Sequence, residues 1–319
     1  MKCHLVLKRT CELSRLEKEQ FCLLFARVFP GTLSLAEFDR KYLCTPLGYS
    51  HHGLMLADDA LIGAYNLIPY TYNYFGMPVL FGLSVDLMIA EDHRGGPFNL
   101  LRMAMMAESA VARDGVAFVF GFPNQNAYEF TRRVLGWADI GRLNFYVLPW
   151  NIGAVVPRLG WSNVLSRTAV RGILSVPRLT RQTRGDFAIE KASDACFNRH
   201  RYDGQHNLIR LHGDGTCVYR ICREDERMRV AFLIDVMPLT PKCFTAAVRA
   251  VHRAAAHHAD VLLYVGRLPF RPGGCLRVPS RWEPRRIRMC GKILRREMVD
   301  ERVLDIANWN VNLSNFDVR

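Results

Sequence analysis

The order of apolar and glycine-rich segments between residues 80 and 122 constrains the fold of this chain most. Residues 80–89 form an apolar run of strand length, and residues 116–122 form a second one. Between them a polar, glycine-rich link leads at Pro97 into residues 98–112, where apolar positions recur with a helical period. Strand, loop, helix and strand in this order indicate an α/β fold in which the two strands are parallel neighbours.

The rest of the sequence extends this pattern. The further predicted elements are helices at 12–28 and 127–134, a hairpin of strands at 53–57 and 61–68 around Asp58-Asp59, and, in the second half, strands at 217–221, 230–235 and 261–265 with a helix at 241–257. The repeated helix-then-strand order hints at a duplication. We therefore expect an α/β (α+β) fold of two similar units, each a mixed sheet flanked by helices.

Composition narrows the class of protein. Half of the residues are hydrophobic and 23% are charged, which excludes a disordered or fibrous chain. Residues 60–85 carry no charge, but glycines, prolines and asparagines interrupt them, so we expect strands there and no membrane span. The first twenty residues lack the apolar core of a secretion signal, which favours a cytoplasmic location. The ten cysteines include no Cys-x-x-Cys pair, and we expect no metal site.

Charge divides the chain. Residues 1–150 hold 14 basic and 14 acidic residues, whereas residues 151–319 hold 29 basic against 16 acidic and so carry the whole net charge of +13. We expect an N-terminal cofactor-binding domain at 1–150, a basic linker at 151–185, and a second domain at 186–319 that faces the anionic acceptor.

The loop before the helix at 98–112 has the composition of an anion site. The expected strand ends in His93-Arg94-Gly95-Gly96 and feeds directly into that helix. Backbone N–H groups at a helix start point outward from its positive end and bind phosphate groups. The loop is neither a P-loop nor a dinucleotide fingerprint, because both motifs are absent.

Several segments together resemble a known family. They are residues 84–96 (SVDLMIAEDHRGG), residues 120–126 (FGFPNQN), Leu135-Gly136-Trp137 and the closing run NWNVNLSNFD at 308–317. This set resembles the GNAT family of acyl-CoA-dependent N-acyltransferases, and within it the tandem-GNAT branch among the sugar N-acyltransferases of polysaccharide and lipopolysaccharide synthesis. The resemblance covers residues 15–150 well and the middle of the chain only in outline.

The resemblance implies acetyl-CoA or another acyl-CoA as co-substrate and assigns roles to individual residues. The backbone of Leu87, Met88 and Ile89 would pair with the pantetheine arm. The N–H groups of Arg94, Gly95, Gly96, Phe98 and Asn99 would hold the pyrophosphate. Parting of this strand from residues 116–122 would open a slot for the thioester. The loop is one residue shorter than the family pattern, and the position of the family's acidic tyrosine holds Arg132, so Tyr128, one turn earlier, is the candidate acid.

Three polar residues of the first half are further candidates for the site. Asp86 lies on an otherwise apolar strand and is the first candidate for a base or an amine-binding group; the alternative is a simple outward-facing residue. Asn124 and Asn126 follow the strand at 116–122, where ligand groups gather in α/β sheets, and we favour a binding role over the alternative of helix capping.

The basic half allows three interpretations. The run of Arg281, Arg285, Arg286, Arg288, Lys292, Arg295 and Arg296 could bind nucleic acid, but sparse aromatic residues and the lack of a motif argue against that. A site for the diphosphate of a sugar nucleotide fits the family better. Residues 152–184 could instead rest on a membrane surface, and a solvated basic face is the plain alternative.

The sequence therefore predicts an N-acyltransferase that moves an acetyl or other short acyl group from acyl-CoA to the amine of an amino sugar, expected to be nucleotide-linked, by direct attack in a ternary complex. The alternatives are a non-catalytic CoA-binding module of the same fold and an acyltransferase for an amino-acid, peptide or lipid-linked amine.

Overall fold

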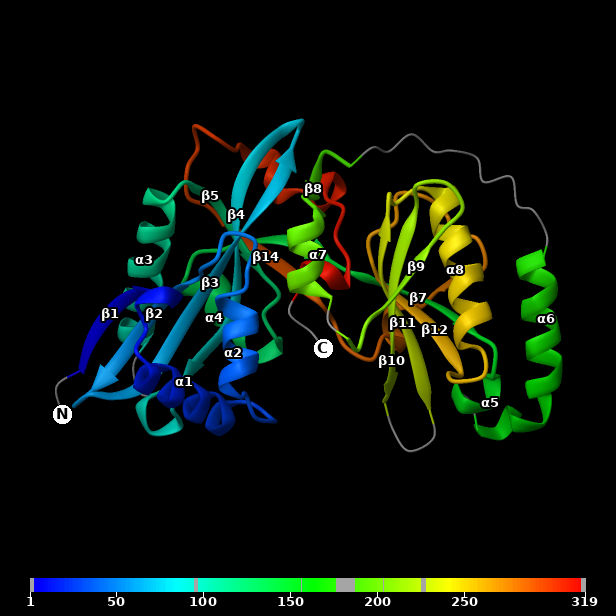
Figure 1. Ribbon diagram of the computed structural model, residues 1–319, viewed down its shortest axis with the longest axis horizontal. Helices are drawn as coiled ribbons and strands as arrows, with labels where there is room; N and C mark the ends of the chain where they lie inside the picture. Colours follow the sequence, from blue (N-terminus) through cyan, green and yellow to red (C-terminus); the bar gives the residue numbers. More distant parts are fainter. Residues whose placement is uncertain are drawn as a thin grey trace. The chain divides into compact units, whose positions relative to one another are not determined.

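The computed structural model describes residues 3–94, 97–155, 157–175, 187–202, 204–224 and 228–316, and the chain folds into two compact units (Figure 1). The first comprises Met1–Arg142, Ala188–Arg201 and Ile287–Trp309, and the second comprises Leu143–Phe187, Tyr202–Arg286 and Asn310–Arg319. Each unit thus takes segments from both halves of the chain, whereas the sequence analysis divided the chain at residues 150 and 185.

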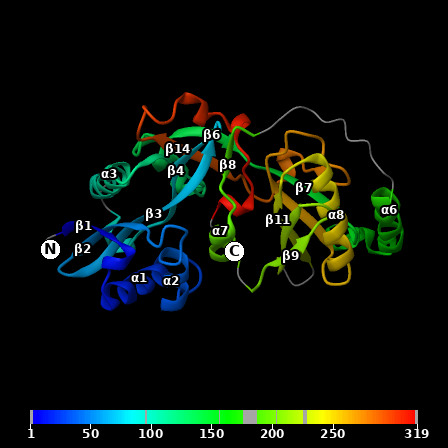
Figure 2. The same cartoon turned by 45° about the horizontal axis from the view of Figure 1, so that its top comes forward.

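The first unit is built on an eight-stranded mixed sheet with helices on both faces. Its strands are β1 (Cys3–Arg9), β2 (His51–Ala57), β3 (Ala60–Tyr74), β4 (Met77–Ile89), β5 (Val116–Gly121), β14 (Arg288–Ile293) and β6 (Ala138–Arg142), in the order β1-β2-β3-β4-β5-β14-β6, with β8 (Ile189–Lys191) beside β3. Helices α1 (Arg15–Val28) and α2 (Leu35–Tyr42) lie on one face and α3 (Pro97–Arg113) on the other (Figure 2). Short helices α4 (Gln125–Arg133) and α7 (Ala195–Arg201) complete the unit.

The predicted strand–helix–strand core is confirmed. β4 and β5 are parallel neighbours, and α3 connects them. The hairpin of β2 and β3 is also present, with Asp58 and Asp59 at φ of 46° and 67°. Aspartate tolerates this left-handed backbone better than most residues, which is why the two-residue turn can close the hairpin.

The second unit has a six-stranded sheet in the order β13-β7-β12-β11-β10-β9. Its elements are β7 (Asn144–Pro149), α5 (Ile152–Val155), the 3-10 turn η3 (Pro157–Ser162), α6 (Asn163–Ser175), β9 (Asn207–Arg210), β10 (Thr216–Arg223), β11 (Arg229–Met237), α8 (Pro241–Ala255), β12 (Val261–Gly266) and β13 (Leu276–Arg277). Val170 and Leu174 of α6 lie in the core of this unit, so the described part of the expected linker belongs to the fold of the second unit. Residues 176–186 of that linker lie outside the described residues.

The two units repeat one motif. In the second unit β10 and β11 are antiparallel, α8 follows, and β12 runs parallel to β11, as β3, β4, α3 and β5 do in the first. The parallel pairing ends at Ser84–Gly121 in the first unit and at Leu233–Tyr264 in the second. An aspartate follows two residues later in both, Asp86 and Asp235. The duplication expected from the pattern is therefore visible at the level of single residues.

The chain's own C-terminal segment fills the gap between β11 and β12. Asn312 bridges Gly266 at the end of β12, and Arg267 donates its N–H to the Val311 carbonyl at 2.9 Å. The Asn312 amide donates to the carboxylate of the fully buried Asp235 at 2.8 Å. Every residue from 310 to 316 is buried. The second unit therefore has the same opening between its parallel strands, but its own residues 310–316 fill that opening.

The corresponding stretch of β4 carries a bulge that a buried polar network holds in place. Asp86 and Leu87 together oppose the single residue Tyr65, and Asp86 has φ of 45°. The Asn66 amide donates to the carbonyls of Val85 and Asp86 at 3.4 and 3.0 Å. Behind it, the ring of His52 contacts Asn66 through Nδ1 at 2.8 Å and Thr10 through Nε2 at 2.9 Å.

The network fixes the protonation of His52. Because the Asn66 amide nitrogen is committed to the bulge, its oxygen faces His52 and accepts from Nδ1–H. Nε2 lies 2.9 Å from the Thr10 hydroxyl, which also lies 3.0 Å from the Tyr42 carbonyl. Complete burial disfavours the charged ring and lowers the pKa of His52 to about 4. The hydrogen bonds that hold the bulge therefore depend on a neutral His52.

A low pH should destabilise the folded protein through His52. The folded protein binds the His52 proton less readily than the unfolded chain, so the stabilisation is complete above pH 6.5, the ordinary pKa, and is lost as the pH falls toward 4. We expect the free energy of unfolding to fall by about 2 kcal/mol between pH 7 and pH 5 through this residue. Urea unfolding at the two pH values measures this loss.

The matched control is a pair of variants. His52→Asn keeps a donor toward Asn66 but does not titrate, and its loss of stability between the two pH values should be smaller than that of the wild type. His257→Asn replaces an exposed histidine and should behave like the wild type. An equal pH dependence in His52→Asn and the wild type would contradict the assignment.

Candidate functional site

The first unit contains a fork between β4 and β5. The last pair of the two strands is Ser84–Gly121; β5 ends there, whereas β4 continues to Ile89. A side-chain carbon at Gly121 would lie 3.2 Å from the Ser84 carbonyl oxygen, so glycine permits the close approach at the base of the fork. Among the described residues no strand pairs with the β5-facing edge of Leu87, Met88 and Ile89. The backbone predicted to pair with the pantetheine arm thus has no strand partner on this edge, although the Ile89 carbonyl accepts from Arg94 Nε at 3.2 Å.

Asp86 lies at the bulge, at the level where the fork opens. Its half-buried carboxylate accepts from Lys41 Nζ at 2.5 Å and from the Tyr42 hydroxyl, so two residues of α2 hold it. A positive φ at a residue other than glycine is strained, and such strain gathers at functional positions. Asp86 is therefore an oriented, partnered carboxylate on the α2 face of the fork and not a simple outward-facing residue.

Helix α3 begins a short distance after β4 ends. The 3-10 turn η2 (Glu91–His93) and Arg94 lead toward Pro97. Phe98 and Asn99 lie exposed in the first turn of this 17-residue helix, where backbone N–H groups have no partner inside the helix. This much agrees with the predicted anion site.

Arg94 departs from the prediction. Its backbone N–H donates to the Glu91 carbonyl at 3.2 Å and its Nε donates to the Ile89 carbonyl at 3.2 Å, so this backbone donor is already taken. The predicted donors Gly95 and Gly96 lie outside the described residues.

Asn124 and Asn126 lie at the start of α4. The Asn124 side chain accepts from the N–H of Ala127 at 2.8 Å and so caps the helix, which is the structural role weighed against ligand binding for this residue. Asn126 is exposed in the first turn of α4. Both remain at the C-terminal end of β5, beside the fork.

Tyr128 points toward a different part of the sheet. Its hydroxyl donates to Asp139 on β6 at 2.5 Å and accepts from Arg288 on β14 at 2.6 Å. Gly121 pairs with Cys290, which pairs with Asp139, so Asp139 lies two strands beyond the base of the fork. Two strand spacings amount to about 10 Å. The Tyr128 hydroxyl is therefore held by Asp139 and Arg288, and its role as the acid stays a prediction.

A buried polar cluster at the base of the fork escaped the sequence analysis. Glu108 of α3 is 4% exposed; it accepts from Trp137 Nε1 at 3.0 Å and from Lys292 Nζ at 2.7 Å. The Tyr65 hydroxyl lies 3.5 Å from the same carboxylate and also hydrogen-bonds Ser84; burial and the nearby Glu108 raise the pKa of Tyr65. The cluster ties the last paired residue of β4 to α3. The sequence offered one signal for this cluster: Glu108 is a lone acidic residue on the apolar side of the predicted helix.

Four cations of the expected basic run, Arg288, Lys292, Arg295 and Arg296, belong to the first unit. Arg288 and Lys292 lie on β14, where Arg288 pairs with Asp139 at 3.0 Å and Lys292 pairs with Glu108. Both therefore neutralise acidic residues contributed by the first half of the chain. The sequence analysis had assigned them to a surface facing an anionic partner.

Two further observations concern a metal site and a membrane-spanning helix. Among the described residues no group of three or more His, Cys, Asp or Glu side chains is arranged to hold a metal ion. No described helix is long and apolar enough to cross a membrane.

Comparisons with known proteins support the fold. No protein-family model matches the sequence, and a search of curated proteins found no match. Among solved structures, a probable N-acyltransferase from Enterococcus faecalis V583 is similar with a TM-score of 0.58 and 13% identity over 92% of this chain and 73% of that one. A GCN5-related N-acetyltransferase from Kribbella flavida has a TM-score of 0.58 and 13% identity over 91% and 71% of the two chains. Eis1 from Mycobacterium abscessus has a TM-score of 0.55 and 14% identity over 92% and 74%. The strand fork and the repeated units thus belong to a mixed α/β chain with the fold of GCN5-related N-acetyltransferases.

Proposed function

We propose that the first unit is an acyl-CoA-dependent N-acyltransferase and that the β4–β5 fork is its site. The observation that carries the proposal is the end of strand pairing at Ser84–Gly121, with an unpaired β4 edge beyond it and the first turn of α3 close by. The similar structures from Kribbella flavida and Enterococcus faecalis are named as an N-acetyltransferase and a probable N-acyltransferase, which supports this activity.

The residues of the fork fit an acyl-CoA. An exposed strand edge offers N–H and C=O groups to an amide-bearing pantetheine arm, in the way that a strand is added to a sheet. The first-turn N–H groups of Phe98 and Asn99 at the positive end of α3 suit a pyrophosphate. The arm and the pyrophosphate are covalently joined in the co-substrate, and the two binding features follow each other along the chain.

Within this site Asp86 receives the proton of the acceptor. The amine nitrogen attacks the thioester carbonyl and forms the amide bond, the carbon–sulfur bond breaks, and the sulfur leaves as a thiolate that takes its proton from solvent. Asp86 sits at the bulge, held by Lys41 and Tyr42, and is the acidic side chain placed to take the ammonium proton or to bind the ammonium. A free backbone N–H of the β4 edge would donate to the carbonyl oxygen as it gains charge.

For the acceptor we propose the amine of a nucleotide-linked amino sugar, and for the acyl group acetyl. The resemblance of residues 84–96 to sugar N-acyltransferases supports this acceptor, and the excess of cations in the second half of the chain suits a diphosphate. Amino-acid, peptide and lipid-linked amines are the other acceptors that the same fork could serve.

The test is a pair of assays on the full chain. Acetyl-CoA at about a hundred times its dissociation constant should stabilise the protein by about 3 kcal/mol, measured as a rise in Tm. Release of free thiol should then be followed with acetyl-CoA and longer acyl-CoAs against amino sugars, nucleotide amino sugars, amino acids, peptides and lipid amines. Stabilisation without thiol release from any amine would indicate a non-catalytic binding module. No stabilisation by any acyl-CoA would contradict the proposal.

Asp86→Asn tests the chemistry. Loss of the base should lower kcat by about a hundredfold or more, while the KM for acyl-CoA stays within about twofold, because the carboxylate lies on the acceptor side of the fork. Steady-state thiol release measures both constants.

Asp59→Asn is the matched control for Asp86→Asn. Asp59 also has a positive φ, 67°, but lies exposed in the β2–β3 turn, so the same substitution should leave both constants unchanged. An unchanged kcat in Asp86→Asn would remove Asp86 from the role of base.

The filled opening of the second unit predicts the stoichiometry. Because residues 310–316 occupy the gap beyond Leu233–Tyr264, each chain should bind one acyl-CoA. Isothermal titration calorimetry counts the sites. Two sites would show that the C-terminal segment can be displaced, whereas no site would contradict the proposed function itself.

A further inference from the structure

Helix α6 and the turn before it expose a continuous apolar face. Trp161 of η3 is 76% exposed, and Val164 and Leu165 of α6 are 72% and 64% exposed. On a helix wheel these three positions lie together, opposite Val170 and Leu174, which pack into the core. Soluble proteins expose single large apolar residues freely, but a contiguous group marks an interaction surface.

Cations flank this face. Arg158, Arg167 and Arg171 are exposed along η3 and α6, and Arg167 is anchored by a hydrogen bond of 2.6 Å from its Nε to Asn151. Neither η3 nor α6 contains an acidic residue. A helix with an apolar stripe and basic flanks is typical of segments that lie in the interface of an anionic membrane.

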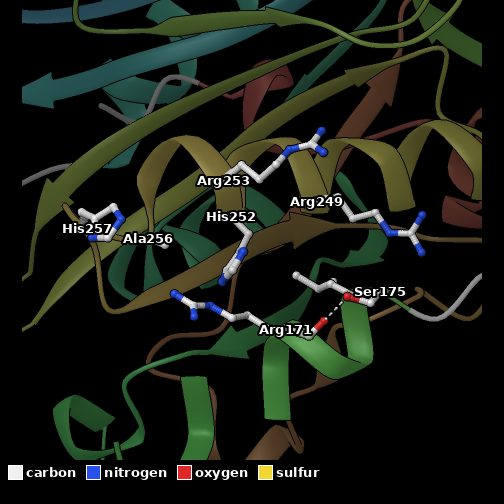
Figure 3. A pocket seen from close by; sticks show the side chains of 8 residues that line it. Arg171, Ser175, Arg249, His252, Arg253, Ala256 and His257 are labelled. Carbon is white, nitrogen blue, oxygen red and sulfur yellow. Dashed lines mark hydrogen bonds between the residues drawn. The ribbon is translucent and has the colours of Figure 1, made fainter. Parts of the chain in front are cut away.

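A groove beside α6 adds a second, independent observation. Figure 3 shows it between α6 and α8, with Arg171 extending from α6 toward His252 on α8. The cavity has a volume of about 480 Å³ and is lined by Arg171, Leu174, Ser175, Arg249, His252, Arg253, Ala256 and His257. None of these is acidic, so the lining is suited to an anion of the size of a phosphate-bearing headgroup.

Figure 3 shows the side chains of Arg171 and His252 close to each other, whereas those of Arg249 and Arg253 extend in other directions. Burial and the neighbouring charge of Arg171 lower the pKa of His252. The lining of the groove, as the structure describes it, contains no carboxylate. Neighbouring cations without a carboxylate repel one another, and an incoming phosphate would relieve that repulsion.

We propose that η3, α6 and the α6–α8 groove form a docking surface for an anionic lipid bilayer. Trp161, Val164 and Leu165 enter the interface between headgroups and acyl chains, and Arg171 of α6 and Arg253 of α8 each contact a lipid phosphate. The positive charge of the surface is complementary to such a membrane. A free phosphate could bind the arginines but would leave Trp161, Val164 and Leu165 exposed to water, whereas a bilayer would bury them. The protein would therefore be membrane-bound without a spanning helix.

Vesicle co-sedimentation of the full chain tests this surface. The protein should bind phosphatidylcholine vesicles that contain phosphatidylglycerol, bind weakly to phosphatidylcholine alone, and dissociate as salt is added. Val164→Ser/Leu165→Ser should weaken binding by about tenfold, and Arg171→Gln and Arg253→Gln by about fivefold each.

Matched control variants distinguish binding through this surface from nonspecific binding to vesicles. Leu23→Ser replaces an apolar residue of α1 that is 67% exposed, and Lys242→Gln removes a charge from α8 outside the groove. Both should bind vesicles as the wild type does, and thermal unfolding should show that all variants are folded.

Three results would overturn the proposal. The first is no binding to anionic vesicles, and the second is equal binding of the surface variants and the controls. The third is binding that depends on Arg171 and Arg253 but not on Val164 and Leu165 and that inorganic phosphate abolishes; this would assign the groove to a soluble anion. None of these measurements requires acyl-CoA, so the outcome does not depend on the proposed activity.

Discussion

The organisation of the first unit depends on where one pair of strands stops pairing. β4 and β5 are held together only as far as Ser84 and Gly121, and the bulge at Asp86 then turns β4 away from its neighbour. Backbone groups inside a sheet are ordinarily satisfied by the next strand, so a stretch of strand without a partner is costly unless something supplies one. Two polar networks stabilise this arrangement from opposite faces of the sheet: His52 and Asn66 on the side of α1 and α2, and Glu108 with Lys292 on the side of α3.

The sequence predicts local elements well and long-range partners poorly. The helix at Pro97–Arg113 and the strands around it follow from periodicity and from Gly and Pro positions, which are local signals. The bulge also has a local signal, since an aspartate interrupts an apolar strand. In contrast, the insertion of β14 between β5 and β6 depends on residues about 170 positions away from β5, and no periodicity reports it.

The lack of a signal for long-range partners also explains which features of the candidate site could be predicted. Asp86 was singled out because an unpaired charge is costly on an apolar strand, but Lys41 and Tyr42, which hold it, could not be paired with it by spacing. Tyr128 matched an expected helix position within one turn, yet its hydroxyl direction is set by Asp139 and by Arg288, which lies 160 residues later. Net charge by halves could not place Arg288 and Lys292, because the halves of the sequence are not the units of the fold.

The late position of β14 in the sequence has a consequence for biosynthesis. Until residues 288–293 have left the ribosome, β5 and β6 expose open strand edges, and the fork lacks the lysine that neutralises Glu108. The second unit waits even longer, because its buried Asp235 meets Asn312 only when residues 310–316 emerge. Neither unit can therefore complete its sheet or its buried contacts until these late segments have emerged from the ribosome.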